Sequence, residues 1–461
     1  MLQIVMVVAY LAITTAMSLY FKRKARNDTT AFYKANGNMP MIVVTTLLFA
    51  ETIAGSGTVG NAANAFNGGL SRAIWANWGM ALGCILFVLT VSRFYRTVSE
   101  KYGVMTIPEA YSILFGNRVR VVMMCIVALV NLILFSTQAS AAASILGPML
   151  DVDPDVLTWV ITAVFVVMAV SGGLLGASWT GVLHAIILFA GAAIVAVAAV
   201  RSAGGMGAVR AAVPEDFFNI IGERPMLTLA SALGMALSFL TSPNATNALF
   251  AARSEKTANR GILLAGLLAM MFALLPAIIG ICARVTMPEI KAESALFLMA
   301  NSIGEVYGGL IAVAIIAAIC STAPTLLVIV SGTITKDLYL PLLAPNATEK
   351  QQLRFSTAVI VVAAVVGTVI GMHAESILDN MLGAFQIRSI AGIVLLAALL
   401  WRRVNGVSAF WSLLGGGVTA AVWFFLKSPL GIAPLWAGAL VCIAILIPVS
   451  LCSKTARANL D

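Results

Sequence analysis

The stretch Phe49-Ala-Glu-Thr-Ile-Ala-Gly-Ser-Gly-Thr58 lies inside a long apolar run and contains two glycines. Glycine permits a helix to unwind, and unwound backbone at membrane depth is tolerated only where it is buried in protein or lines a cavity. A second stretch, Ala317-Ala-Ile-Cys-Ser-Thr-Ala-Pro-Thr325, combines hydroxyls with a proline that cannot donate a hydrogen bond to the carbonyl of Cys320. Both stretches are predicted to expose oxygen acceptors, which a hard cation such as sodium needs. Paired interruptions of this kind indicate a coupled ion and substrate site.

The composition is that of an integral membrane protein. Hydrophobic residues make up 61% of the 461 residues, charged residues 10%, and the mean hydropathy is +0.99, so most of the chain would be insoluble in water. Its apolar runs of about 20 residues fit helices, whereas the strands of a membrane barrel would alternate over about 10 residues. Lysine and arginine in short cytoplasmic loops explain the net charge of +9, so no nucleic acid is implied. The six cysteines have no paired spacing and indicate neither disulfides nor a metal site.

The apolar runs predict an all-α polytopic membrane protein with about thirteen transmembrane helices. The spans are expected at 2–21, 39–66, 73–92, 120–148, 155–171, 176–200, 226–250, 262–286, 304–333, 355–372, 377–401, 407–426 and 432–452. The basic run 22–26 follows the first span, which places the N-terminus outside and, by alternation, the later basic loops and the C-terminus in the cytoplasm. We therefore expect a multi-pass protein of the plasma membrane, which in a bacterium is the inner membrane.

The spans divide into two blocks of five. If spans two to six and seven to eleven form these blocks, the odd number forces the second block to begin on the opposite side of the membrane, so the blocks are related by inversion. The predicted divisions are a peripheral first helix and cytoplasmic loop at 1–38, a first repeat at 39–200, a second repeat with its extracellular loop at 201–403, and two peripheral helices with a tail at 404–461. The first core helix is expected to be discontinuous, and Ser242-Pro-Asn244 interrupts the first helix of the second block.

Four stretches of the predicted core have counterparts in one known family. They are Phe49–Gly57, Gly172–Thr180, Phe250–Arg260, and Ala318–Thr322 together with Thr335–Tyr339. In this order they resemble the first core helix, the Gly-Gly and Trp-Thr signature, the basic cytoplasmic loop, and the eighth core helix with its exit in the sodium:solute symporters. This family includes proline, pantothenate, sialic acid and sodium/glucose transporters. The resemblance implies a transporter built from an inverted repeat.

By this resemblance, one sodium ion lies between the first and eighth core helices. Its ligands would be the backbone carbonyls of Ala50, Ile53 and Ala318 and the hydroxyls of Ser321 and Thr322. Neutral oxygens suit a small hard cation that has to leave again, because no negative charge holds it permanently. The alternative is that the two hydroxyls only bond back to carbonyls one turn earlier, which is common in membrane helices.

Three positions depart from the family pattern. Gly181 stands where most relatives have an acidic residue, and Pro324 stands where some have serine. The family uses the positions of Gly181 and Pro324 for a second sodium site or for the exit path of the ion, so we expect a single sodium ion. His184 lies three residues after Gly181, on nearly the same helical face, where relatives often have glutamine. It is interpreted either as a proton-linked residue or as a neutral, hydrogen-bonding histidine.

Ionisable groups inside the membrane mark functional positions, because an unpaired charge there costs several kcal/mol. Arg388 is expected inside the span 377–401 and Glu51 at the interruption. Arg388 either binds a substrate carboxylate in a bidentate pair or is paired permanently with Glu51 or Asp379. The substrate candidates are Glu51, Thr52, Ser56, Asn131, Gln138, Ser242, Asn244, Gln386 and Arg388. For the polar residues outside the two interruptions, a hydrogen bond between helices is the alternative.

The sequence thus predicts a secondary transporter in which a sodium gradient drives uptake of a small polar metabolite by alternating access. Arg388 favours a carboxylate-bearing solute. The expected partners are this solute, sodium and the lipid bilayer, and the chain is expected to be a monomer or a homodimer. Two alternatives stay open: a proton-coupled symporter of the same fold, in which Glu51 or His184 titrates, and a membrane sensor that no longer transports. Neither histidine has the neighbours needed for acyl transfer, so no enzyme is expected.

Overall fold

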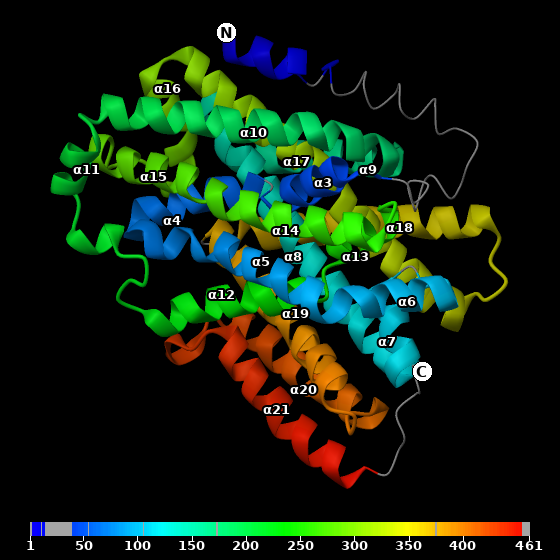
Figure 1. Ribbon diagram of the computed structural model, residues 1–461. Coiled ribbons are helices and arrows are strands. Elements are labelled where there is room, and N and C mark those ends of the chain that lie inside the picture. Colours follow the sequence, from blue (N-terminus) through cyan, green and yellow to red (C-terminus); the bar gives the residue numbers. More distant parts are fainter. Residues whose placement is uncertain are drawn as a thin grey trace.

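The protein is described by a computed structural model that covers residues 2–10, 12–13, 39–53, 55–104, 106–171, 174–373 and 376–453. Side chains are described throughout these ranges except at 50–52, 56, 171, 174–180 and 321. Within them the chain is helical, and its β structure is limited to one isolated bridge between Met39 and Ala252 (Figure 1). The predicted all-α polytopic fold is confirmed.

The described helices follow one another with short connections. In chain order they are α3 (Met41–Thr52), α4 (Gly55–Ala73), α5 (Trp75–Leu86), the π-helical segment η2 (Phe87–Val91), α6 (Ser92–Tyr102), α7 (Ile107–Phe115), α8 (Asn117–Leu150), α9 (Pro154–Ser171), α10 (Leu174–Ser202), α11 (Met206–Ala212), the 3₁₀ segment η3 (Glu215–Phe218), α12 (Pro225–Phe239), α13 (Pro243–Ala251), α14 (Glu255–Phe272), α15 (Leu274–Thr286), the 3₁₀ segment η4 (Ala292–Ser294), α16 (Ala295–Ile303), α17 (Glu305–Ile334), the π-helical segment η5 (Thr335–Leu343), α18 (Glu349–Met372), α19 (Ile377–Leu400), α20 (Gly406–Phe425), the 3₁₀ segment η6 (Pro429–Gly431) and α21 (Pro434–Cys452).

Ten helices in the described part of the chain are long and apolar enough to cross a membrane. The count of about thirteen is therefore not confirmed. The predicted span 2–21 lies partly outside the described residues, the predicted span 39–66 is divided between α3 and α4, and Pro154–Val170 is a shorter apolar helix. Several spans continue beyond the predicted apolar runs, because polar and charged residues extend the same helix past the hydrocarbon region.

The helices pack in pairs that repeat with a shift of five core helices. In one group α4 packs on α15 and α5 packs on α12; in the other α8 packs on α18 and α9 packs on α17. When each helix is exchanged for its counterpart in the other block, the pair α4 and α15 becomes the pair α12 and α5. The same exchange turns the pair α8 and α18 into the pair α17 and α9, as an inverted five-plus-five repeat requires. The boundaries of the two repeats, 39–200 and 201–403, stay a prediction.

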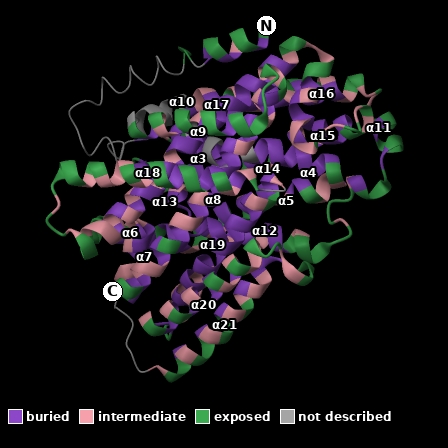
Figure 2. Ribbon diagram, turned by 180° about the vertical axis from the view of Figure 1, so that it is seen from behind, coloured by how far each residue is buried: buried purple, intermediate pink, exposed green. Residues whose placement is uncertain are grey.

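Burial separates a central part of the bundle from a peripheral part. The most apolar windows of α19 and α17 are 78% and 76% buried, whereas that of α21 is 28% buried. Figure 2 shows the buried residues concentrated in the middle of the molecule, and Figure 1 shows α20 and α21 together at one edge. Polar groups on α17 and α19 are therefore shielded from lipid by their neighbours, and these two helices are the expected carriers of the functional site.

One glycine sets the approach of α19 to α12. A Cβ atom at Gly392 would lie 2.0 Å from the carbonyl oxygen of Leu237, so only glycine allows this contact. Small residues at membrane helix interfaces permit such close backbone approach. The contact brings the middle of α19 against the end of α12, where the helix is interrupted.

Candidate functional site

The predicted interruption of the first core helix is present. Helix α3 ends at Thr52, Ile53 leaves helical geometry with φ −102° and ψ 16°, and α4 begins at Gly55. Ala54 lies outside the described residues. The second interruption lies at the corresponding place in the second block, where α12 ends at Phe239 and α13 begins at Pro243 with Ser242 as its N-cap. The backbone carbonyls at both interruptions are released from regular helix hydrogen bonding.

Helix α17, by contrast, runs without interruption from Glu305 to Ile334, with Pro324 inside it. A proline within a continuous helix still leaves the carbonyl four residues earlier, that of Cys320, without its helical donor. The stretch 317–325 is therefore part of an unbroken helix, and only one of the two predicted acceptor stretches is an unwound segment.

The interruption at 53–55 lies directly against α17. A Cβ atom at Gly55 would be 2.0 Å from Cγ1 of Ile319 and 3.3 Å from Cγ2 of Ile315. A hydrogen atom is the only side chain that fits at this position without displacing Ile319. The sequence-distant stretches 49–58 and 317–325 are thus packed together, and Ile319 at the contact is the immediate neighbour of Ala318.

Three of the five residues proposed for sodium have described side chains, and these three lie in buried positions close to this contact along the chain. Ile53 and Ala318 are fully buried, and Thr322 is 3% exposed. The Thr322 hydroxyl donates to the carbonyl of Ala318 at 2.9 Å, so the back-bond that the sequence left open is present. The Thr58 hydroxyl donates to the carbonyl of Ile53 at 2.8 Å. A hydroxyl that donates one proton keeps its lone pairs, and a carbonyl has two, so these contacts leave coordination capacity.

Two of the five predicted sodium ligands are only partly described. For Ala50 the position in α3 is described, and for Ser321 the position in α17, but the side chain of neither residue is. Among the described residues, no three His, Cys, Asp or Glu side chains gather into a metal-binding group. The oxygens at the interface of α3, α4 and α17 that the structure describes are neutral, as the predicted ligand set requires.

Arg388 lies in the middle of α19 and is 3% exposed. Its Nε donates to the Ser238 hydroxyl at 2.8 Å, and its guanidinium lies over the ring of Phe385 at 5.2 Å from the centroid. Among the described side chains, none of the four ion pairs includes Arg388. Since Ser238 is in the last turn of α12, the cation lies beside the second interruption.

The permanent pairing of Arg388 with Asp379 is wrong. Asp379 lies near the start of α19, where it accepts a hydrogen bond from Asn64 Nδ2 at 3.2 Å and faces Arg72 at 4.0 Å. Nine residues of helix separate it from Arg388, a rise of about 13 Å. The side chain of Glu51, the other proposed partner, lies outside the described residues, as do those of Thr52 and Ser56.

Several other substrate candidates have bonds within the protein. Gln386 accepts a hydrogen bond from the Leu435 backbone N–H at 3.2 Å and so holds the first turn of α21. Asn131 donates to the Val127 carbonyl at 2.7 Å, one turn earlier in α8. Ser242 accepts from the Ala245 N–H at 3.4 Å as the cap of α13.

Two further candidates differ in their exposure. Gln138 is buried in α8 and has a partner, whereas Asn244, in the first turn of α13, is half-buried. The amide of Asn244 is therefore more accessible than that of Gln138.

His184 is buried in α10, and neither of its ring nitrogens has a hydrogen-bond partner in the described part of the protein. Its ring packs on Tyr10 of the N-terminal helix, with centroids 5.8 Å apart. The interpretation as a hydrogen-bonded histidine therefore does not describe this environment, which is one of apolar and aromatic packing.

Ser238 was not among the sequence candidates, although it is the one hydrogen-bond partner of Arg388 in the described structure. Its position four residues before Ser242 placed it one helical turn from the recognised interruption, and this spacing was an available signal. Thr58, which donates to the carbonyl of Ile53, was not among the candidates either, although it is the last residue of the stretch 49–58.

Solved structures with the same fold are transporters. A sodium-coupled sialic acid symporter in a substrate-bound, outward-open state superposes with a TM-score of 0.80 at 17% identity, covering 100% of this chain and 99% of that one. Mhp1, a nucleobase-cation-symport-1 family transporter, superposes with a TM-score of 0.61 at 15% identity, covering 93% and 96%. At these identities the likeness establishes the fold alone.

Sequence comparison gives the family. The chain is 25% identical over 419 residues to the high-affinity proline transporter PutP of Bacillus subtilis, covering 88% of both chains. It is 24% identical over 380 residues to the sodium/proline symporter of Haemophilus influenzae, covering 76% of this chain and 74% of that one. The profile of the sodium:solute symporter family matches residues 32–416, which is most of the chain. The protein is therefore a multi-pass membrane transporter and not an enzyme, and it belongs to the sodium:solute symporter family.

Proposed function

We propose that this sodium-coupled symporter imports a small carboxylate-bearing solute, with proline as the first candidate, and that Arg388 binds the carboxylate. The proposal is supported chiefly by the environment of Arg388, a buried guanidinium that has one serine hydroxyl and one aromatic ring as partners and no carboxylate among the described side chains. A buried cation without an anion is costly in a membrane, and a substrate carboxylate would supply the missing partner. The relatives named as proline transporters act on a solute of this class.

The surroundings of Arg388 suit an anion in a second way. Helix α13 begins at Pro243, and the N-terminus of a helix carries a partial positive charge. The Ser238 contact uses Nε, which leaves the two terminal nitrogens of the guanidinium for a bidentate pair with a carboxylate. Asn244, half-buried in the first turn of α13, offers an amide for the polar remainder of the solute.

Sodium would bind at the contact of α3 and α4 with α17. The Thr322 hydroxyl lies 2.9 Å from the Ala318 carbonyl, and the Ile53 carbonyl belongs to the interruption that packs on α17. Ala50 and Ser321 would complete this set of neutral oxygens. Because Gly181 provides no carboxylate for a second ion, we propose one sodium per solute. Binding of sodium would fix the interruption of the first core helix and raise the affinity for the solute, and the coupling is reciprocal.

Uptake into proteoliposomes tests the proposal. The purified protein is reconstituted, and uptake of radiolabelled proline is measured with an inward gradient of sodium or of choline at the same pH on both sides. We expect concentrative uptake only with sodium, and competition by small carboxylates but not by their amides. Uptake that is unchanged in choline would contradict the sodium coupling. Competition by uncharged sugars as strong as that by carboxylates would contradict the assignment of the substrate class.

A further inference from the structure

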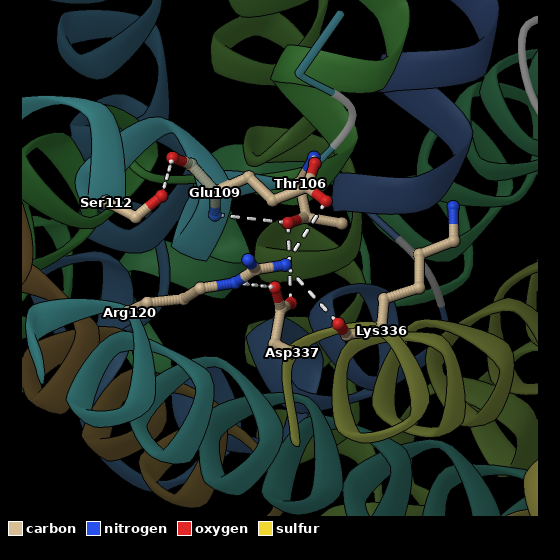
Figure 3. A network of polar contacts seen from close by, with 6 residues as sticks. All are labelled: Thr106, Glu109, Ser112, Arg120, Lys336 and Asp337. Carbon is tan, nitrogen blue, oxygen red and sulfur yellow. Dashed lines mark hydrogen bonds and ion pairs between the residues drawn. The ribbon is translucent and has the colours of Figure 1, made fainter. Parts of the chain in front are cut away.

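A polar network lies where η5, α7 and α8 meet, far along α17 from the sodium region. Arg120, in the first turns of α8, donates from Nε to Asp337 Oδ1 at 2.7 Å and from a terminal nitrogen to Glu109 Oε1 at 3.3 Å (Figure 3). The same terminal nitrogen donates to the backbone carbonyl of Lys336 at 3.3 Å. The Thr106 hydroxyl donates to Asp337 Oδ2 at 3.4 Å.

The network ties three separate elements together through one guanidinium. The side chain of Asp337 has no exposed surface, and those of Arg120 and Glu109 are 20% and 26% exposed. Thr106 and Glu109 also form the capping box that starts α7. Arginine presents its donors in a rigid planar fork and can hold two carboxylates at once, which a lysine cannot do in the same geometry.

Two neighbouring helices attach to different parts of the bundle on either side of this network. Helix α6 is bound to the second interruption by Tyr95, which donates to the Leu240 carbonyl at 3.1 Å, and to the end of α13 by Arg96, which donates to the Leu249 carbonyl at 3.2 Å. Helix α8 packs instead on α17, α18 and α19. The chain thus passes from the group that contains α5 and α12 to the group that contains α8 and α18 between α6, which ends at Tyr102, and α7, which begins at Ile107 and packs on α8.

We propose that Arg120 is a positioning residue of the transport cycle, which anchors the α6–α7 connection and the end of α17 to α8. The inference rests on the proposed function in that two groups of helices must move against each other to alternate access. A connection that crosses from one group to the other has to be fixed at one end. The Arg120 network fixes this connection at Thr106, which it ties to η5 at the end of α17, the helix that carries Ala318 and Thr322.

The anchor has consequences for rate more than for affinity. None of its residues lies near Arg388 or Thr322 in the chain, and Asp337 is 15 residues beyond Thr322, a distance of about 22 Å along a helix. Loosening the network would let α7 and the end of α17 follow the moving group. The conformational exchange would then be less efficient, whereas the solute would still meet an unchanged site.

The test compares Arg120→Gln with Arg118→Gln, a matched control in the first turn of the same helix, whose side chain is exposed. We expect Arg120→Gln to lower the maximal uptake rate at least tenfold with less than a twofold change in KM, and Arg120→Lys to fall between it and the wild type. Arg118→Gln is expected to transport normally. Equal rates in the two glutamine variants, or a loss carried by KM alone, would overturn the proposal.

Hydrogen exchange separates this inference from the proposed function, since it needs no solute. In Arg120→Gln we expect faster deuterium uptake in 106–112 and 335–343 than in the wild type, and no such change in Arg118→Gln. Unchanged exchange in Arg120→Gln would overturn the anchor even if proline is transported. If Arg120→Gln does not fold, Thr106→Val provides a milder test, because it removes one hydroxyl contact with Asp337 and is expected to raise exchange in the same segments.

Discussion

Two arginines lie in the interior of this transporter in opposite circumstances. Arg120 is bound by two carboxylates, those of Asp337 and Glu109, and by a backbone carbonyl. Arg388 is more deeply buried, and its partners among the described side chains are one serine hydroxyl and an aromatic ring. The better shielded charge thus has the poorer set of partners, which is the reverse of what stability alone would select.

The difference separates a structural charge from a binding charge. A guanidinium whose donors are satisfied by the protein has little capacity left for a ligand. One that is desolvated and short of an anion is held ready for a ligand that brings one, and its cost is offset when the solute arrives. The sodium region adds a third arrangement, with neutral oxygens only, which suits an ion that must also leave.

The largest expected effect is on stability, at Arg120. Replacing it by methionine leaves Asp337 and Glu109 without their cation, and breaking a buried pair in this way costs about 3 to 5 kcal/mol. Arg388→Met removes a cation without stranding a carboxylate among the described side chains, so its thermal unfolding midpoint in detergent should equal or exceed that of the wild type. A greater loss of stability in Arg388→Met than in Arg120→Met would reverse the comparison.

The second effect is on solute binding, at Arg388. Arg388→Gln keeps a polar side chain but loses the charge, and truncating one partner of a buried charge pair costs about 3 kcal/mol, on the order of a hundredfold in KM or Kd. Uptake kinetics of proline measure it, and Arg388→Lys should recover only part of the loss because it cannot bind bidentately. A wild-type KM in Arg388→Gln would remove the carboxylate assignment.

A smaller effect is expected at Ser238, the partner of Arg388. Ser238→Ala deprives the buried guanidinium of its hydrogen bond, at a cost of about 2 kcal/mol. Because Ser238 holds the guanidinium in place for the carboxylate, the rise in unfolding temperature on adding proline should be smaller in Ser238→Ala than in the wild type. Ser231→Ala is the matched control, since that hydroxyl lies in the same helix and donates to the Leu227 carbonyl at 3.0 Å. Identical shifts in both variants would show that Ser238 does not hold the binding charge.

The smallest effect is expected where no charge is involved. Thr322→Val keeps the shape of the side chain and removes one proposed sodium ligand. The half-saturating sodium concentration should therefore rise about tenfold, which corresponds to about 1.4 kcal/mol of binding free energy. Thr419→Val is the control, because Thr419 makes the same bond to the carbonyl one turn earlier, Gly415 at 2.7 Å, in the peripheral helix α20. A similar sodium dependence in both variants would mean that Thr322 serves only its own helix.

Much of the fold could be predicted from hydropathy, and the errors of that prediction have local causes. The count of about thirteen spans was not confirmed, since ten described helices meet the criterion and the run 39–66 is two helices in the structure. Glycines at 55 and 57 and the Ser242-Pro-Asn244 stretch correctly predicted both interruptions. Pro324 did not predict a third, because α17 continues through it. A proline removes one hydrogen bond, and neighbouring helices can hold the rest of the helix in place.

The site was predictable in kind but not in its contacts. Candidate residues were found by being polar in apolar runs, which selects Gln386 and Asn131 as readily as Arg388. In the structure, Gln386 is hydrogen-bonded to α21, Asn131 to its own helix, and Arg388 to Ser238. These outcomes depend on which face of each helix meets which neighbour, and helices that are apolar on all sides carry no such signal.

The sequence by itself determined the solvent of this protein, the positions of its two helix interruptions and the chemical character of its polar groups, because hydropathy, glycine and proline act locally along the chain. Only the tertiary structure decided that Gly55 meets Ile319, that Arg120 is paired and that Arg388 and Asp379 are apart. The physical reason is that contacts between apolar membrane helices are set by close packing of small residues and by a few buried hydrogen bonds, and neither is encoded in the hydropathy of any one span.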